Sequence, residues 1–157
     1  MPGHCRYGTI TTVDESPLTA EVLWVGTDDG RVHVTRDGGA NWTVADHPTV
    51  IRLNDVYFQD DITGWAVGVY DDLNLNCCLY TADGGDSWAQ QDAVLVSGAE
   101  LFSVHFRDNL VGVACGASGA FLHTNSGGVS GWALNISMPL VNLNSVWNTG
   151  LLHGCAV

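Results

Sequence analysis

The chain of 157 residues contains no lysine and only five arginines, against 17 acidic residues. Its formal net charge at pH 7 is −12. Phosphate backbones and anionic lipids would be repelled by such a surface, so nucleic acid and acidic membrane headgroups are excluded as expected partners. Apolar residues make up 46% of the sequence, which is enough to fill the core of one domain.

The sequence also lacks long apolar runs and any helical periodicity. No stretch of eighteen apolar residues occurs, so no membrane span is predicted. The first residues, from Met1 to Arg6, do not include the apolar segment of a signal peptide. The five cysteines have no Cys-x-x-Cys spacing, which excludes a zinc ribbon, and we interpret most of them as small core residues.

A polar eight-residue pattern occurs twice, at residues 35–42 and 81–88, and a worn third copy follows at 124–132. Its aspartate can accept hydrogen bonds from backbone N–H groups, its glycines permit positive φ, and its tryptophan can cover the turn. In the third copy a serine replaces the aspartate, so we expect that turn to be held less tightly. The pattern predicts three structural turns, built by Thr35, Asp37, Gly39 and Trp42, by Thr81, Asp83, Gly85 and Trp88, and by Thr124, Ser126, Gly128 and Trp132.

Strand-like segments repeat together with these turns. Each segment starts with a leucine that is followed eleven positions later by a glycine (53 to 64, 101 to 112 and 143 to 154), and the glycine opens a second apolar segment. Four short strands in each repeat of 40 to 50 residues are typical of a β-propeller blade. We predict an all-β fold, a single partial β-propeller of four-stranded antiparallel blades at about 8–50, 51–98 and 99–140, with the first two strands of a fourth blade at 141–157.

The eight-residue pattern resembles the Asp-box, or BNR repeat, of sialidases, xyloglucan-type glycoside hydrolases and sortilin-like receptors. The finer order, a Leu-x-x-Val-x-Phe strand, then Gly64 to Gly68, then residues 79–88, is most similar to photosystem II assembly factors of the Ycf48/HCF136 type. Residues 25–39 are instead similar to the glycosidase-like repeats. In these families the Asp-box lies at the blade periphery and serves structure, so the resemblance implies a fold rather than an activity.

A sialidase resemblance would imply three arginines that clasp a carboxylate. Here Arg31 and Arg36 belong to a third strand and its turn, and Arg52 precedes a first strand, so this triad is not supported. Hydrolysis of a glycoside needs two carboxyl groups across a cleft, and nearly all aspartates fall in predicted turns. Asp55 is the exception, and we interpret it as a polar residue that lines the channel.

No catalytic, cofactor-binding or metal-binding residue is predicted. His33, His105 and His123 alternate with apolar residues in three different units and share no metal-ligand spacing. The acidic turns at 28–30 and 71–74 lack the fuller loop of a calcium site, so we interpret them as solvated turns.

The sequence therefore favours a non-catalytic, Ycf48-like scaffold for protein–protein interaction. A fragment of a BNR-type glycoside hydrolase with an incomplete active site is the alternative, and glycan binding stays open with it. Three and a half blades cannot close a ring, so we expect a fragment of a longer chain, two copies that complete one ring, or an open stack whose ends self-associate; the fragment is favoured. The compartment stays open, and it would be secreted, periplasmic or thylakoid-lumenal if a targeting segment is missing.

Overall fold

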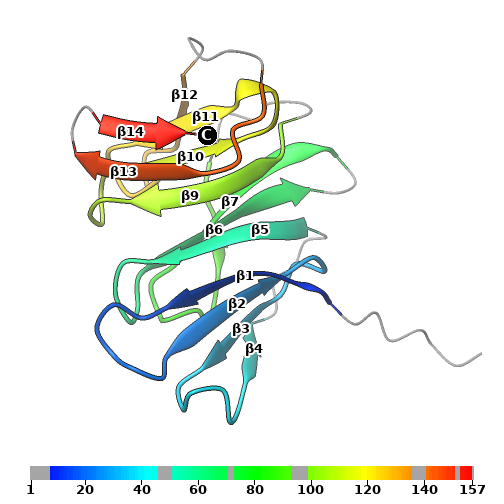
Figure 1. Ribbon diagram of the computed structural model, residues 1–157, viewed down its shortest axis with the longest axis vertical. Coiled ribbons are helices and arrows are strands. Elements are labelled where there is room, and N and C mark those ends of the chain that lie inside the picture. The colour runs from blue at the N-terminus through cyan, green and yellow to red at the C-terminus, as the bar shows by residue number, and fades with distance from the viewer. Residues whose placement is uncertain are drawn as a thin grey trace, which may run out of the picture.

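The computed structural model describes residues 8–45, 51–70, 73–92, 99–135, 141–150 and 153–156 (Figure 1). The first sheet contains β1 (Ile10–Glu15), β2 (Leu23–Thr27), β3 (Val32–Thr35) and β4 (Thr43–Ala45). The second contains β5 (Ile51–Phe58), β6 (Gly64–Tyr70), β7 (Leu75–Thr81) and β8 (Ala89–Gln90). The third contains β9 (Leu101–Phe106), β10 (Gly112–Gly116), β11 (Phe121–Thr124) and β12 (Ala133–Leu134). The last two strands, β13 (Val146–Gly150) and β14 (His153–Ala156), form a pair.

Every sheet has the strand order of the sequence, and all the pairings are antiparallel. This is the order that short hairpin connections produce, because an antiparallel neighbour needs only a tight turn. A 3₁₀ turn at Ala117–Gly119 joins β10 to β11. Three four-stranded sheets and a two-stranded fourth confirm the predicted all-β, partial propeller fold. Among the described residues, no helix has the length and apolarity needed to cross a membrane.

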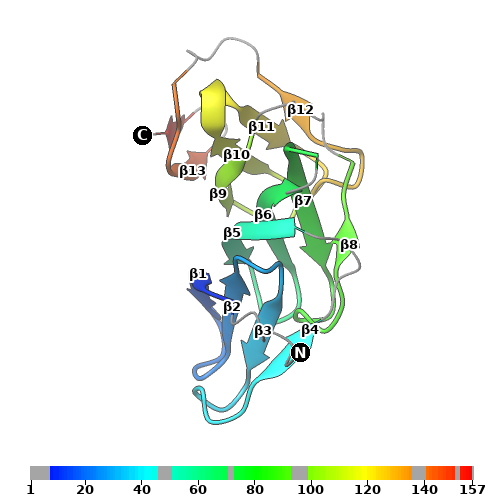
Figure 2. The same cartoon turned by 90° about the vertical axis from the view of Figure 1, so that its right-hand side faces the viewer.

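The sheets stack face to face in chain order, as Figures 1 and 2 show. Their first strands contact one another in succession, β1 with β5, β5 with β9, and β9 with β13. Figure 2 shows these first strands along one side of the stack, and β4, β8 and β12 along the other. We call the first strands the inner strands. Side chains on them can therefore meet across sheets.

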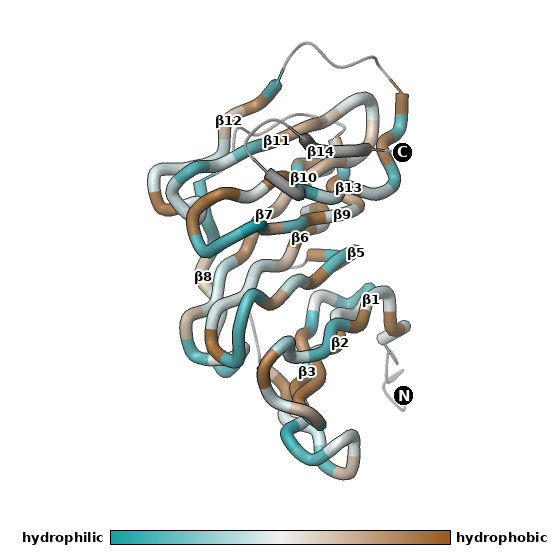
Figure 3. Tube along the Cα trace, turned by 60° about the vertical axis from the view of Figure 1, so that its left-hand side comes forward, coloured by the Kyte–Doolittle hydropathy of each residue, from teal (hydrophilic) through white to brown (hydrophobic). Residues whose placement is uncertain are grey.

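Burial follows from the stacking. All seven residues of β6 and all five residues of β10 are buried, because each of these strands has a sheet on both faces. In β1, by contrast, exposed and half-buried residues alternate. Hydrophobic residues (brown in Figure 3) accordingly occur in the strands of the first three sheets.

An aromatic cluster joins the first sheet to the second. The Trp24 indole, from β2, lies flat against Phe58 of β5, with ring centroids 3.6 Å apart and an interplanar angle of 7°. Its Nε1 donates a hydrogen bond of 2.8 Å to the carbonyl oxygen of Gly84, in the turn between β7 and β8. Trp88, which follows that turn, packs edge-on against Phe58. We call this set of contacts the first junction.

The second junction repeats the first one sheet further along the chain. Trp65 of β6 stacks on Phe106 of β9 at 3.6 Å and 13°, and its Nε1 donates to the Gly127 carbonyl oxygen at 3.0 Å. Trp132 packs edge-on against Phe106. An apolar ring pair and a buried hydrogen bond thus hold the first sheet to the second and the second to the third, which combines area burial with a satisfied indole N–H. Self-association through the two ends of the stack stays a prediction.

The junction should make Gly85 much less tolerant of a side chain than Gly39. A Cβ on Gly85 would lie 3.2 Å from the Trp24 ring, whereas a Cβ on Gly39 would meet only its own turn's Trp42, at 3.9 Å. Both residues have positive φ, +89° and +96°, so alanine strains each backbone by about 1 kcal/mol. Gly85→Ala should lower the free energy of unfolding by about 1–3 kcal/mol more than Gly39→Ala, because of overpacking. Urea denaturation followed by tryptophan fluorescence measures both, and equal losses would contradict a packed junction.

Candidate functional site

The second Asp-box turn is held by its threonine and its aspartate together. The Thr81 hydroxyl accepts the N–H groups of Asp83 and Gly85, at 3.3 and 3.0 Å, and donates to the Asp83 carboxylate at 2.8 Å. The carboxylate also accepts the backbone N–H and the hydroxyl of Ser87, at 2.9 and 2.6 Å. The Ser87 hydroxyl, followed by its N–H, lowers the pKa of Asp83. The turn therefore depends on the threonine for two N–H groups and on the aspartate for one.

The first turn has the same geometry. Gly39 donates its N–H to the Thr35 hydroxyl at 2.9 Å, and Thr35 donates to Asp37 at 2.8 Å. Asp37 accepts both the side-chain amide and the backbone N–H of Asn41, which lower its pKa. Trp42 donates to the Gly39 carbonyl oxygen at 3.1 Å and remains 41% exposed.

The third turn keeps the hydrogen bond to the threonine hydroxyl, but the contacts made at the aspartate position and by the tryptophan differ from those of the first two turns. Gly128 donates to the Thr124 hydroxyl at 2.9 Å, and Ser126 accepts a single N–H, from Ser130, at 3.0 Å. Buried Gln91 reaches in from the second sheet, where it accepts from Trp132 Nε1 at 2.9 Å and donates to the Gly127 carbonyl oxygen at 2.7 Å. Nothing in the repeat pattern indicated this contact. The Gln91 side chain thus links the third turn to the second sheet.

A second set of contacts links the inner strands. Side chains on each inner strand bond to the backbone of the next one: Asp14 accepts the Phe58 N–H at 2.6 Å, and Asp55 accepts the Val104 N–H at 2.9 Å. His105 Nδ1 accepts the Asn148 N–H at 3.2 Å, so the proton of the neutral ring lies on Nε2.

Asp55 lies on the inner strand β5, but its carboxylate is occupied. It accepts the hydroxyl of Thr12 and the N–H of Val56, each at 3.0 Å, in addition to Val104. Burial raises its pKa above the usual range. The residue therefore ties three sheets together through hydrogen bonds.

A groove of about 660 Å³ crosses the ends of the four inner strands. Four side chains at equivalent positions, one from each sheet, lie along it: Asp14, Tyr57, His105 and Trp147. Neighbouring rings contact each other, with Tyr57 and His105 centroids 4.9 Å apart and His105 and Trp147 centroids 4.3 Å apart. We call Tyr57, His105 and Trp147 the aromatic row. The groove is completed by Glu15, Pro17, Phe58, Gln59, Phe106, Arg107 and Asn148.

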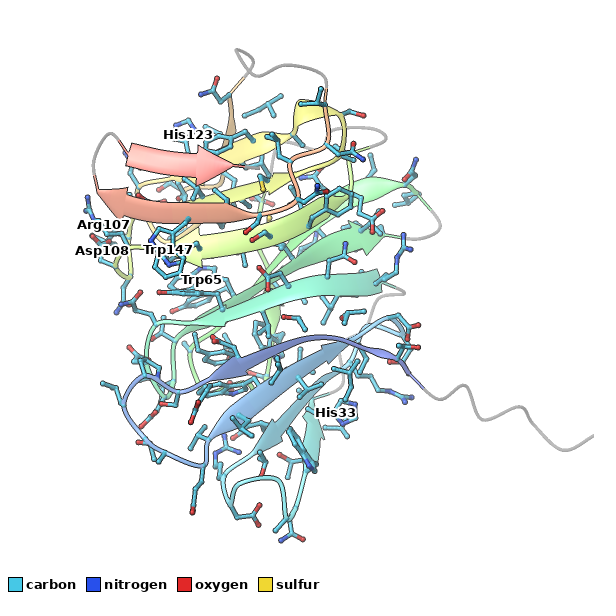
Figure 4. All side chains as sticks on the ribbon, in the orientation of Figure 1. His33, Trp65, Arg107, Asp108, His123 and Trp147 are labelled. Carbon is cyan, nitrogen blue, oxygen red and sulfur yellow. The ribbon has the colours of Figure 1, made fainter. Side chains whose placement is uncertain are left out.

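The charges of the groove are uneven. Asp14 and Glu15 lie on β1, and burial raises the pKa of Asp14 to about 6. On β9, burial lowers the pKa of His105, which favours the neutral ring. Arg107 follows β9 and pairs with Asp108 at 2.6 Å, so its charge is largely compensated. Figure 4 shows Arg107, Asp108 and Trp147 at the same edge of the stack.

The three histidines considered as ligands do not come together. His33 lines a smaller pocket beside Trp42 on the first sheet, and His123 is exposed on β11 in the third. Figure 4 shows the two far apart. Within the described ranges, no group of three or more His, Cys, Asp or Glu side chains could hold a metal ion. Cys77, Cys78 and Cys115 are buried free thiols whose pKa is raised by burial.

Replacing Asp83 should loosen the second turn. Asp83→Ala removes the acceptor of the Ser87 N–H and of two hydroxyls, which should lower the free energy of unfolding by about 1–2 kcal/mol. Asp86→Ala is the matched control in the same turn, because it removes only the exposed ion pair with Arg36, which contributes little. Urea denaturation compares the two. A loss as large for the control as for Asp83→Ala would argue against the carboxylate's role.

Asp14 should make the protein less stable as pH rises from about 4 to 6. Its pKa is about 6 in the folded chain against 3.8 ordinarily, so the folded state keeps a proton that the unfolded state has lost. The stabilisation is present below pH 4 and is lost as pH rises through 6. A two-unit shift corresponds to about 3 kcal/mol, and partial solvation reduces this to on the order of 1–2 kcal/mol. Urea unfolding between pH 4 and 7 should show that the free energy of unfolding declines less steeply with pH in Asp14→Asn than in the unchanged protein. The same slope in both proteins would contradict the raised pKa of Asp14.

Comparison with known families and structures identifies relatives of this architecture. Residues 39–141 match the family model described as photosynthesis system II assembly factor YCF48. A structure titled YCF48 bound to D1 peptide is similar with a TM-score of 0.68 and 22% identity, over 88% of this chain and 44% of that one. YCF48 from Cyanidioschyzon merolae gives a TM-score of 0.64 and 24% identity, over 81% and 37%.

A third similar structure is the computationally designed Ika4 protein, with a TM-score of 0.64, 15% identity, and coverage of 96% of this chain and 84% of that one. At these identities the structural likenesses show the fold alone. This chain spans less than half the length of the two YCF48 structures. No curated protein sequence matches it.

Proposed function

Because the chain belongs to the family of the photosynthesis system II assembly factor YCF48, we propose that it is a non-catalytic scaffold that binds an extended segment of a partner protein. The segment lies across the inner strands, in the groove that contains the aromatic row. Residues 8–50, 51–98 and 99–140 each contribute one blade to this scaffold, and 141–157 contribute the start of a fourth.

The exposed Trp147 carries the proposal. It is 61% exposed although its ring contacts His105, and it lies in a groove long enough to cross four sheets. Large aromatic side chains that stay exposed beside a hollow are typical anchors of protein interfaces. A solved YCF48 relative is bound to a D1 peptide, which supports a peptide as the class of partner.

The groove favours binding over hydrolysis. Asp14 and Asp55 accept backbone N–H groups of the next sheet, which gives both carboxyls a structural role in holding the inner strands together. All four arginines of the described ranges form ion pairs, Arg31 with Asp29, Arg36 with Asp86, Arg52 with Glu100 and Arg107 with Asp108. The glycoside hydrolase alternative therefore gains no support from a specific feature of this groove.

Selection from a displayed library of random dodecapeptides tests the proposal. Peptides enriched on the protein should lose at least tenfold in affinity for Trp147→Ala, because the anchor ring is removed. They should bind Trp42→Ala within twofold of the unchanged protein, since Trp42 is also exposed but lies outside the groove. A D1 peptide that competes with the selected peptides would support a role in photosystem II assembly.

Failure to enrich any peptide would overturn the proposal. Enriched peptides that bind Trp147→Ala normally would also do so, because they would occupy another surface.

A further inference from the structure

The described arginines leave the groove without a free positive charge. Asp14 and Glu15, two acidic residues of β1, line its β1 end. Arg107, the arginine that lines the groove, donates from both Nε and a terminal nitrogen to Asp108, at 2.9 and 2.6 Å. His105 accepts the Asn148 N–H with Nδ1 and is therefore neutral in this arrangement. The residues that line the groove thus include two acidic side chains and one arginine, whose charge is already compensated by Asp108.

The aromatic row complements that charge. Trp147 exposes most of its ring, and the electron-rich face of an indole is the best of the aromatic faces for attracting a cation. Arginine in particular stacks flat on such rings and keeps its charge at every physiological pH. A guanidinium on Trp147 would lie on the same groove as the two β1 carboxyl groups.

The whole chain adds a longer-range preference. A formal charge of −12 with no lysine creates a field that concentrates cations at the surface and repels acidic partners. An acidic segment would therefore be repelled by the overall charge as it approaches and by the β1 carboxyl groups once it is bound. Neutral segments would gain from the rings but would bring no positive charge to the acidic β1 end.

We propose that the groove selects an arginine-rich extended segment of its partner protein, with one guanidinium stacked on Trp147 and another attracted to the β1 end, where Asp14 and Glu15 lie. This deepens the proposed scaffold function and rests on it. The preference for a basic segment depends on the side chains of the groove rather than on the fold, because the equivalent positions of the four sheets carry different residues.

Three labelled decapeptides of glycine and serine test the preference, carrying four arginines, four glutamines or four glutamates. In fluorescence anisotropy at low salt, the arginine peptide should bind at least tenfold more tightly than the other two. Raising sodium chloride from 20 to 200 mM should weaken it by about tenfold, as counterions screen the β1 carboxyl groups.

Two double variants separate the groove from the overall charge. Asp14→Asn with Glu15→Gln should weaken the arginine peptide at least tenfold, and circular dichroism verifies its fold. Glu21→Gln with Asp86→Asn removes the same charge outside the groove and should change affinity less than twofold.

Equal weakening in both double variants would overturn the groove as the site of selection. A glutamine peptide that binds as tightly as the arginine peptide, with loss in Trp147→Ala, would overturn the basic preference and leave the scaffold function standing. If neither these peptides nor any displayed dodecapeptide binds, both proposals fail.

Discussion

The stack depends on one contact that occurs twice. In each case the tryptophan in the second strand of a sheet stacks on a phenylalanine of the next sheet, and its indole N–H donates a hydrogen bond to the Asp-box turn of that next sheet. Trp24 and Trp65 each bury a large ring and satisfy the indole N–H at a glycine carbonyl oxygen. Because the acceptor belongs to the Asp-box turn, a polar surface motif becomes part of the joint between sheets. A four-stranded sheet of this kind has two apolar faces, so it is stable only with such neighbours.

The Asp-box turns also help to hold neighbouring sheets together. The threonine and the aspartate fix the backbone so that the glycine carbonyl oxygen points back at the preceding sheet. Where the aspartate is missing, at Ser126, the buried amide of Gln91 bonds to both the turn and its tryptophan. At this turn a tertiary contact therefore adds to the local network.

The inner strands combine a constant geometry with changing chemistry. At equivalent positions the four sheets present a carboxylate, a phenol, an imidazole and an indole, and the first three bond to the backbone of the next sheet. The stacking places them in one row, while their differences give the groove an acidic end and an aromatic end. The chemistry of the row therefore varies from sheet to sheet while the strand geometry stays the same.

The strand order, the antiparallel sheets and the turn positions could be predicted from the sequence, because these depend on short-range patterns: apolar segments at fixed spacing, positive-φ glycines and hydroxyl caps. The sequence also predicted the YCF48 family, since the Asp-box and the Gly-Trp-Ala-Val-Gly strand lie at fixed spacing. The contacts between sheets, in contrast, are visible only in the folded structure. The acceptor of Trp65 lies 62 positions away in the chain, and no local pattern records such a distance. Asp14, Tyr57, His105 and Trp147 likewise form a row only once the sheets stack, and so the groove could not be predicted from the sequence.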